Sequence, residues 1–211
     1  IEYNCFADCV ALKTCNLPSS LEYIGSSVFS GCVELEKIEI PSSVKSIGNG
    51  VFADCVKLTD ITLPSEITII EGCLFLRCTA LRKVTCLGEI KKIGEHSFQE
   101  CSSLEIAVIP NGVTIVGDSA FNACKSLTKI ETPSSLNQLG DGVFQGYTSL
   151  NQATINGDGT LQLGKSMFRG CTSLESVVLG DGVASIADGY YRSGWTSTTY
   201  YGMFSNCSSL K

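Results

Sequence analysis

Twelve cysteines are the side chains in this 211-residue sequence with the widest chemistry, since thiolates act as nucleophiles, metal ligands and disulfide partners. Eight of them recur at a wide, regular spacing, and the interval between consecutive members is constant over the first six. These eight are Cys9, Cys32, Cys55, Cys78, Cys101, Cys124, Cys171 and Cys207. A zinc site or a compact disulfide framework needs cysteines that lie much closer together. The spacing therefore predicts structural thiols and no metal site.

The same thiols raise the question of disulfides between repeats. If the repeats stack, equivalent cysteines lie about 5 Å apart, a separation that nominally permits a disulfide. A run of such neighbours cannot all pair without distorting the stack. We therefore expect free thiols in a buried column of small apolar side chains.

No other residues suggest catalysis. His96 is the only histidine, which excludes a multi-histidine metal site, and no nucleophile and base are paired in the sequence. We predict no enzyme activity, no catalytic residue and no cofactor. The 21 acidic residues against 15 basic ones give a net charge of -6, which disfavours a nucleic-acid partner. The apolar runs are only a few residues long, so the sequence contains no transmembrane segment.

The phenylalanines explain the spacing of the cysteines. All nine belong to one series, in which the first six gaps are equal, the next is one residue longer and the last is much longer. A leucine follows each phenylalanine by six residues. The series is Phe6, Phe29, Phe52, Phe75, Phe98, Phe121, Phe144, Phe168 and Phe204. A fixed period of about 23 residues is typical of a solenoid, in which each repeat stacks on its neighbours.

One repeat, over residues 35–55, shows which elements must place these side chains. Its Leu-x-x-Ile-x-Ile stretch predicts a short strand, because the last two apolar residues alternate. Pro41 ends the strand, since it cannot donate a ladder hydrogen bond. A second apolar pair turns the chain back, and Gly48 takes a tight corner. The segment from Phe52 towards the next leucine predicts a short helical turn on the outer face.

The pattern Leu35-x-x-Ile38-x-Ile40-Pro41-x-x-Val44-x-x-Ile47-Gly48-x-x-x-Phe52-x-x-Cys55 resembles the leucine-rich repeat of the BspA-like, or Treponema pallidum type, class. The match covers essentially all of residues 1–211. We therefore expect a single α/β repeat domain, a leucine-rich-repeat solenoid of about nine 23-residue units. A parallel β-sheet would form its concave face, with short helical turns opposite. Both ends of the chain fall within a repeat and lack a polar capping unit, so we expect further repeats beyond them.

The longest gap in the series marks an aromatic insertion at residues 188–203. It lengthens the repeat by more than half, and it holds four of the seven tyrosines and the only tryptophan. Tyrosine and tryptophan among small polar residues are typical of recognition loops. We predict that ligand-binding residues here are Tyr190, Tyr191, Trp195, Tyr200 and Tyr201. The alternative is a loop that covers the end of the array or packs on a further repeat.

A smaller insertion of one residue lies near residues 156–160. The segment Asn-Gly-Asp-Gly-Thr suggests a widened turn or a calcium site. Calcium needs six to eight oxygen ligands. The segment offers few, so we favour the turn.

The outward positions of the predicted strands form a second candidate surface. They vary between repeats while the buried positions barely change. The candidate residues are Lys37, Glu39, Asp60, Thr62, Lys83, Thr85, Ile106, Val108, Lys129 and Glu131. Ile106 and Val108 form an apolar spot, and the lysines in the repeats on either side give it a polar rim. The alternative is that these are ordinary solvated strand residues.

The resemblance also implies a function. Proteins of this class act as surface or secreted adhesins in host-associated bacteria and some parasitic protists. We therefore expect a protein-binding module that contacts a host or matrix protein or a glycan, located at the cell surface or secreted. The alternative is an intracellular, cytoplasmic scaffold or assembly protein on the same solenoid.

Overall fold

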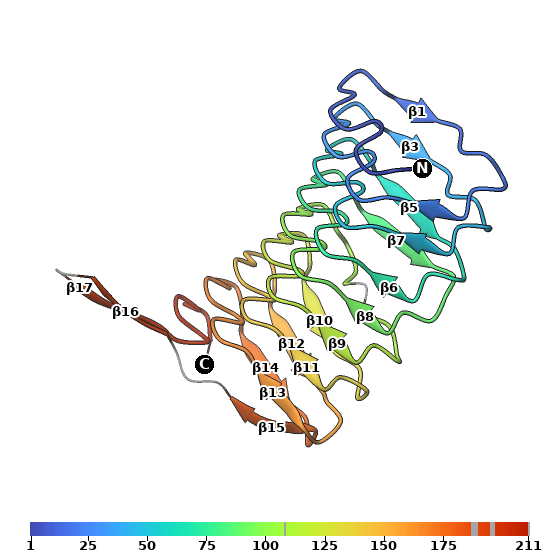
Figure 1. Cartoon of the computed structure of the whole chain (residues 1–211). Coiled ribbons are helices and arrows are strands. Elements are labelled where there is room, and N and C mark those ends of the chain that lie inside the picture. Colours follow the sequence, from blue (N-terminus) through green and yellow to red (C-terminus); the bar gives the residue numbers. More distant parts are fainter. Residues whose placement is uncertain (108, 187–189, 195–196, 211) are drawn as a thin grey trace.

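The computed structural model describes residues 1–107, 109–186, 190–194 and 197–210. It is a parallel β-solenoid whose turns follow one another in sequence order from the N-terminal to the C-terminal end (Figure 1). Side chains that meet across neighbouring turns, such as those of Asp54 and Arg77, are separated by 23 residues in the sequence. About seven regular turns span the first eight phenylalanines, and a longer turn reaches the last. The expected nine full units are therefore an overestimate.

A first row of strands coincides with the predicted Leu-x-x-Ile-x-Ile segments. Its members are β1 (Thr14–Cys15), β3 (Lys37–Ile38), β5 (Asp60–Leu63), β7 (Lys83–Cys86), β10 (Lys129–Glu131), β12 (Gln152–Ile155) and β14 (Ser176–Leu179). They pair in parallel as β1-β3, β5-β7 and β10-β12-β14. Inward residues such as Ile61 are buried, and outward residues such as Thr62 are exposed, as a period of two requires.

A second row of short strands follows the proline position of the repeat, which Leu87, Asn156 and Gly180 occupy in three of the turns. It comprises β2 (Tyr23–Ile24), β4 (Ser46–Ile47), β6 (Ile69–Ile70), β8 (Lys92–Ile93), β9 (Ile115–Val116), β11 (Gln138–Leu139), β13 (Leu161–Leu163) and β15 (Val183–Ile186). Six of them form a continuous parallel sheet, β15-β13-β11-β9-β8-β6, and β2 pairs with β4. Our expectation of one sheet was therefore incomplete. The apolar pair that we interpreted as a return segment also pairs from turn to turn.

The predicted helical turns are wrong, since the described residues contain no helix. The residues two before and two after each of the first eight phenylalanines have a positive φ, as at Ser27 (57°) and Gly31 (73°). Alternating handedness stops a helix from propagating. It sends the backbone N–H groups of Ser27, Phe29 and Gly31 to carbonyls of the next turn, at 2.8, 3.0 and 2.8 Å. The phenylalanine segments thus form a third row of bonds between turns.

The core runs unbroken along the axis of the solenoid. The nine phenylalanine rings stack in order with centroids 5.0 to 6.3 Å apart. The leucine six residues after the ring, such as Leu58, Leu81 and Leu104, is fully buried in the inner turns. The phenylalanine and leucine positions are therefore core positions, as the period predicts.

The glycine that closes many repeats is needed for a different reason from the predicted corner. Gly94 lacks a positive φ. A Cβ atom added to it would lie 2.5 Å from the backbone nitrogen of Gly72 in the preceding turn. Close approach of two backbones, and not a left-handed conformation, excludes a side chain there.

Two departures from the consensus compensate for each other. Thr132 replaces a buried aliphatic residue, and Asn156 replaces a proline in the next turn. The Thr132 hydroxyl donates to the Asn156 carbonyl (2.9 Å) and accepts from its N–H (2.8 Å), while the Asn156 amide donates to the Thr132 carbonyl (2.9 Å). Asp158 then accepts two bonds from Thr160, so the inserted residues form a side-chain-capped turn, as we favoured.

Candidate binding surfaces

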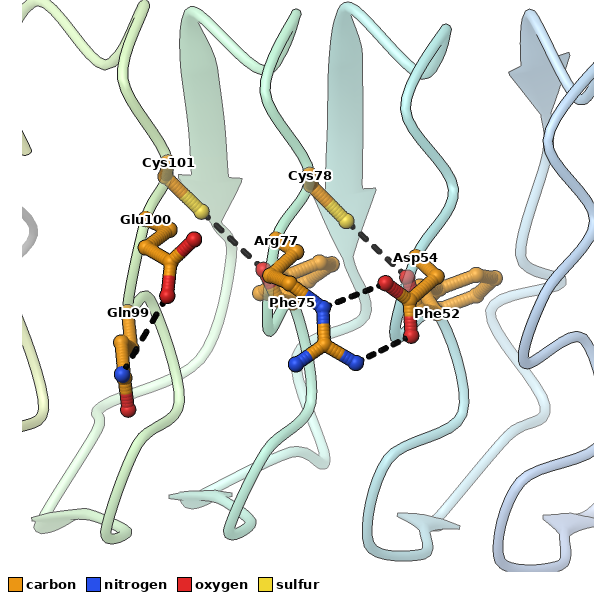
Figure 2. A network of polar contacts seen from close by, with 8 residues as sticks. All are labelled: Phe52, Asp54, Phe75, Arg77, Cys78, Gln99, Glu100 and Cys101. Atoms are coloured by element: carbon orange, nitrogen blue, oxygen red, sulfur yellow. Dashed lines mark hydrogen bonds and ion pairs between the residues drawn. The ribbon is translucent and has the colours of Figure 1, made fainter.

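The cysteine column proves to be a ladder of hydrogen bonds. Each thiol donates to the carbonyl oxygen of the phenylalanine in the preceding turn, as with Cys78 to Phe52 (2.9 Å) and Cys101 to Phe75 (3.0 Å) (Figure 2). The same bond recurs from Cys32 to Cys207. Where the column has Tyr147 instead, its buried hydroxyl donates to the Phe121 carbonyl at 2.7 Å. The thiols therefore act as structural donors as well as small core side chains.

These thiols are poor nucleophiles. All twelve cysteines are free thiols in the structure, including the eight of the predicted column. Burial disfavours the thiolate and raises the pKa of Cys55 and Cys124 to about 12. Cys78 and Cys101 are raised well above their ordinary pKa for the same reason. Because the thiolate is the reactive form, the ladder is chemically inert at neutral pH.

The surface beside this ladder carries an ion pair between turns. The Arg77 guanidinium donates two bonds to the Asp54 carboxylate, at 2.6 and 2.7 Å (Figure 2). This contact raises the pKa of Arg77. Both side chains are partly exposed, so solvent screens the attraction. In the neighbouring turn, His96 Nδ1 lies 2.7 Å from Gln99 Oε1. That contact positions the histidine without providing a nucleophile.

The predicted strand face lines a series of hollows. One hollow of about 490 Å³ lies over β1 and β3, and a second of about 520 Å³ lies over β3, β5 and β7. A third of about 340 Å³ lies over β7 and residues 105–110. Neighbouring hollows share lining residues, namely Lys37 and Glu39 for the first two and Lys83 for the last two. Together they make one trough, which we call the strand-face groove.

The structure brings six predicted residues together in the middle hollow. They are Lys37, Glu39, Asp60, Thr62, Lys83 and Thr85. All are exposed except Thr85, which is half-buried. The predicted residues further along, Lys129 and Glu131 on β10, are exposed but do not line this hollow. Their exposure and proximity fit a contact surface.

The predicted apolar spot lies at a break in the first row of strands. Residues 105–107 form no strand, and Ile106 is 73% exposed, the most exposed large apolar residue of the described chain. Val108 lies outside the described residues. Arg82, Glu105 and Pro110 also line the third hollow. Sequence analysis missed these three, because they stand outside the alternating strand positions.

The aromatic insertion contains an antiparallel hairpin. Its strands are β16 (Tyr190–Gly194) and β17 (Ser197–Tyr201), and they extend away from the stacked turns in Figure 1. The register places Tyr190 opposite Tyr201 and Tyr191 opposite Tyr200. Trp195 lies outside the described residues. The insertion is thus a paired element and not an irregular loop.

Among the described residues, no three histidine, cysteine, aspartate or glutamate side chains gather as metal ligands. The described chain also has no helix that is long and apolar enough to cross a bilayer. Two further hollows, of about 580 and 430 Å³, lie along the second row of strands, and Gln138 lines both. The strand-face groove contains most of the predicted strand-face residues, and the hairpin contains most of the predicted aromatic ones.

Comparison with known proteins agrees with this architecture. The model of the BspA-type leucine-rich-repeat region, which has 6 copies, matches residues 1–108 and again residues 91–211. The two matches span the whole chain, and the protein belongs to the BspA-type leucine-rich-repeat family.

The chain is also similar to several solved structures. The chain is similar to a leucine-rich repeat protein from Bacteroides ovatus, with 26% identity, a TM-score of 0.68 and coverage of 99% of this chain and 62% of that one. It therefore spans about three fifths of the length of that protein. The leucine-rich-repeat protein of Treponema pallidum is 22% identical, with a TM-score of 0.40 and coverage of 100% and 71%. A leucine-rich cell surface protein of Faecalibacterium prausnitzii is 21% identical, with a TM-score of 0.41 and coverage of 100% and 81%. No curated protein sequence matches the chain.

Proposed function

We propose that this protein is a non-enzymatic binding module that holds a protein or glycan ligand in the strand-face groove, as an adhesin-like protein at the cell surface or in secreted form. The observation that carries the proposal is the pairing of a constant core with a hollowed outer face. Lys37, Asp60 and Lys83 occupy equivalent positions in successive turns and differ in charge, although the core beneath them repeats. Variable, exposed side chains over a constant core are what a recognition surface needs.

The hairpin is the second part of the proposal. An isolated two-stranded hairpin is only marginally stable in water. Tyrosine and tryptophan dominate binding hot spots, and this hairpin concentrates them. We expect replacement of Trp195, Tyr200 and Tyr201 by alanine to weaken binding by several kcal/mol, at roughly 2 kcal/mol or more for each hot spot.

Capture experiments with four forms of the protein test both parts. The forms are the natural chain, a chain lacking residues 189–201, a groove variant and a matched control. The groove variant changes Lys37, Glu39, Asp60 and Lys83 to alanine. The control changes to alanine Glu22, Lys45, Glu66 and Lys125, which are also exposed and line no hollow of the groove. Each is incubated with host extracellular-matrix and cell-surface extracts, and bound proteins and glycans are identified by mass spectrometry.

Loss of a captured ligand in the groove variant, with retention in the control, supports the groove. Loss on hairpin deletion supports the hairpin. Equal capture by all four forms contradicts both the groove and the hairpin as binding sites.

An intracellular scaffold is the second candidate function. It is favoured by the exposed free thiols of Cys5 and Cys9, which suit a reducing compartment. Capture from a cytosolic extract alone would support it.

A further inference from the structure

The third hollow of the strand-face groove differs from the other two in its lining. Apolar atoms of Val84, Ala107, Ile109 and Pro110 line it, and Ile106 stands at its edge, 73% exposed. Its volume of about 340 Å³ lies at the lower end of the range of small-ligand pockets, about 300–1,000 Å³. A hollow of this size and lining has room for an apolar side chain.

The sequence gives a physical reason for the hollow. Nine residues after the phenylalanine, the turns on either side place Val84 and Ile130 in the core. The intervening turn has Ala107 at that position, and its smaller side chain is only half-buried. Ala153 stands at the same position two turns on and is fully buried within a paired strand, so the space at Ala107 depends also on the break in the first row of strands. A partner side chain that filled this space would remove apolar surface from water.

Charges beside the hollow indicate the chemistry around such a side chain. Arg82 and Lys83 line the hollow, and Lys129 occupies the position equivalent to Lys83 two turns on. None of these three cations has an ion pair among the described residues, whereas Lys45, Lys57, Arg77 and Lys91 all do. Glu105 is the only acidic residue in the lining, so the described wall of the hollow is net positive in a protein of net charge -6.

We propose that this hollow receives an apolar side chain from an extended segment of a partner protein, and that an acidic residue of the segment contacts Arg82 and Lys83. The proposal rests on the groove's being the binding surface proposed above. The segment is extended because the hollow opens into the rest of the groove through Lys83, across several turns. The cations provide the charge complementarity that selects acidic neighbours for the apolar anchor.

Fluorescence anisotropy with three labelled nonapeptides tests the proposal. The first has a central leucine flanked by aspartates in a glycine–serine background. The second has lysines in place of the aspartates, and the third has glycine in place of the leucine. We expect the first peptide to bind at least about tenfold more tightly than either of the others, and more weakly as salt rises from about 0.1 to 0.5 M.

Variants of the chain locate the site. Ile106→Asp should weaken binding of the acidic peptide at least about tenfold. The new negative charge stands at the mouth of the hollow and repels the aspartates of the peptide. Arg82→Glu with Lys83→Glu should reverse the preference, so that the lysine peptide binds better. Ile69→Asp and Lys92→Glu are matched controls, since both residues are exposed on the second row of strands. Neither control should change affinity, and all variants should keep the melting temperature within a few degrees.

Three results would overturn the proposal. The acidic peptide could fail to bind, all three peptides could bind equally, or the Ile106→Asp variant could bind the acidic peptide as tightly as the natural chain. The capture experiment tests the proposed function independently of these peptides. If the natural chain still loses its captured ligand in the groove variant, the groove binds a ligand of other chemistry, and only the apolar anchor is wrong.

Discussion

The phenylalanines of the inner turns hold neighbouring turns together in two ways. The ring stacks on the rings before and after it, and in most turns the carbonyl accepts both a backbone N–H of its own turn and a thiol of the next, with the Tyr147 hydroxyl in place of the thiol at Phe121. For Phe75 these donors are the N–H of Cys78 and the thiol of Cys101. The ring position was predictable from the period alone. The thiol bond was not, because it depends on how far one turn is displaced from the next.

Truncation of a central ring measures this contribution. Phe98→Ala should lower the free energy of unfolding by roughly 3–5 kcal/mol, because it leaves a cavity between Phe75 and Phe121, whose ring centroids lie 5.4 and 5.0 Å from that of Phe98. Urea denaturation followed by circular dichroism gives the value. Ile69→Ala, at an exposed position, is the control and should change stability little. If Phe98→Ala left the free energy of unfolding unchanged, the assignment of Phe98 to the core would be wrong.

The thiols make stability depend on pH in one direction. The folded state keeps Cys55 and Cys124 protonated up to a pKa of about 12, while the unfolded chain loses these protons near pH 8.5–9. The folded state therefore binds more protons above pH 9, so its stability falls as pH rises from 9 towards 12. We expect a lower urea midpoint at pH 10.5 than at pH 7.5. The double variant Cys55→Ala, Cys124→Ala should show a smaller fall, and an equal fall would assign the effect to other groups.

At the scale of the element, strands were more predictable than turns. Alternation in segments such as 60–63 identified the first row because each residue reveals its face by its polarity. The second row consists largely of pairs of residues, which are too short for a period to be visible. The phenylalanine segments were wrongly predicted as helical turns. Asp54, Arg77 and Ala123 adopt a positive φ there, and a positive φ can be predicted from sequence only where the residue is glycine.

The bonded pair of Thr132 and Asn156 offers a test at this scale. Comparison of the repeats alone suggests that Thr132→Val restores the consensus and stabilises the protein. The structure predicts the opposite, a loss of about 1–3 kcal/mol, because the N–H and carbonyl of Asn156 lose their partner. Thermal or urea melts decide between the two. Thr128→Val, at an exposed threonine of the same repeat, is the control and should have little effect.

At the scale of the whole molecule, the period of the sequence was enough to predict the fold. It predicted the binding surface only in part. The middle hollow of the groove contains the residues expected from their outward positions. The third hollow arises from Ala107 and from the break beside it, and no pattern within a single repeat marks that position. Side chains that meet across turns, such as Arg82 and Pro110, can be recognised only once the turns are stacked.

A solenoid of equal turns should tolerate removal of one whole turn. Deleting residues 53–75 removes one full period, so Phe98 takes the place of Phe75 after Phe52, and the chain should fold with one fewer interface. Deleting residues 53–72 removes less than a period and shifts every later ring out of line. Circular dichroism and urea titration should show cooperative unfolding for the first chain and its loss for the second. Similar behaviour of the two would mean that the ring stack does not determine the register.

The three rows of hydrogen bonds between turns also determine how the molecule responds to force. A pull on its two ends loads the turns in series, since each contacts only its neighbours. A regular turn that peels away releases about 80 Å of chain, at roughly 3.5 Å per residue. The protein therefore lengthens in steps of nearly equal size. The turns that are still folded keep their shape while the unfolded part of the chain extends.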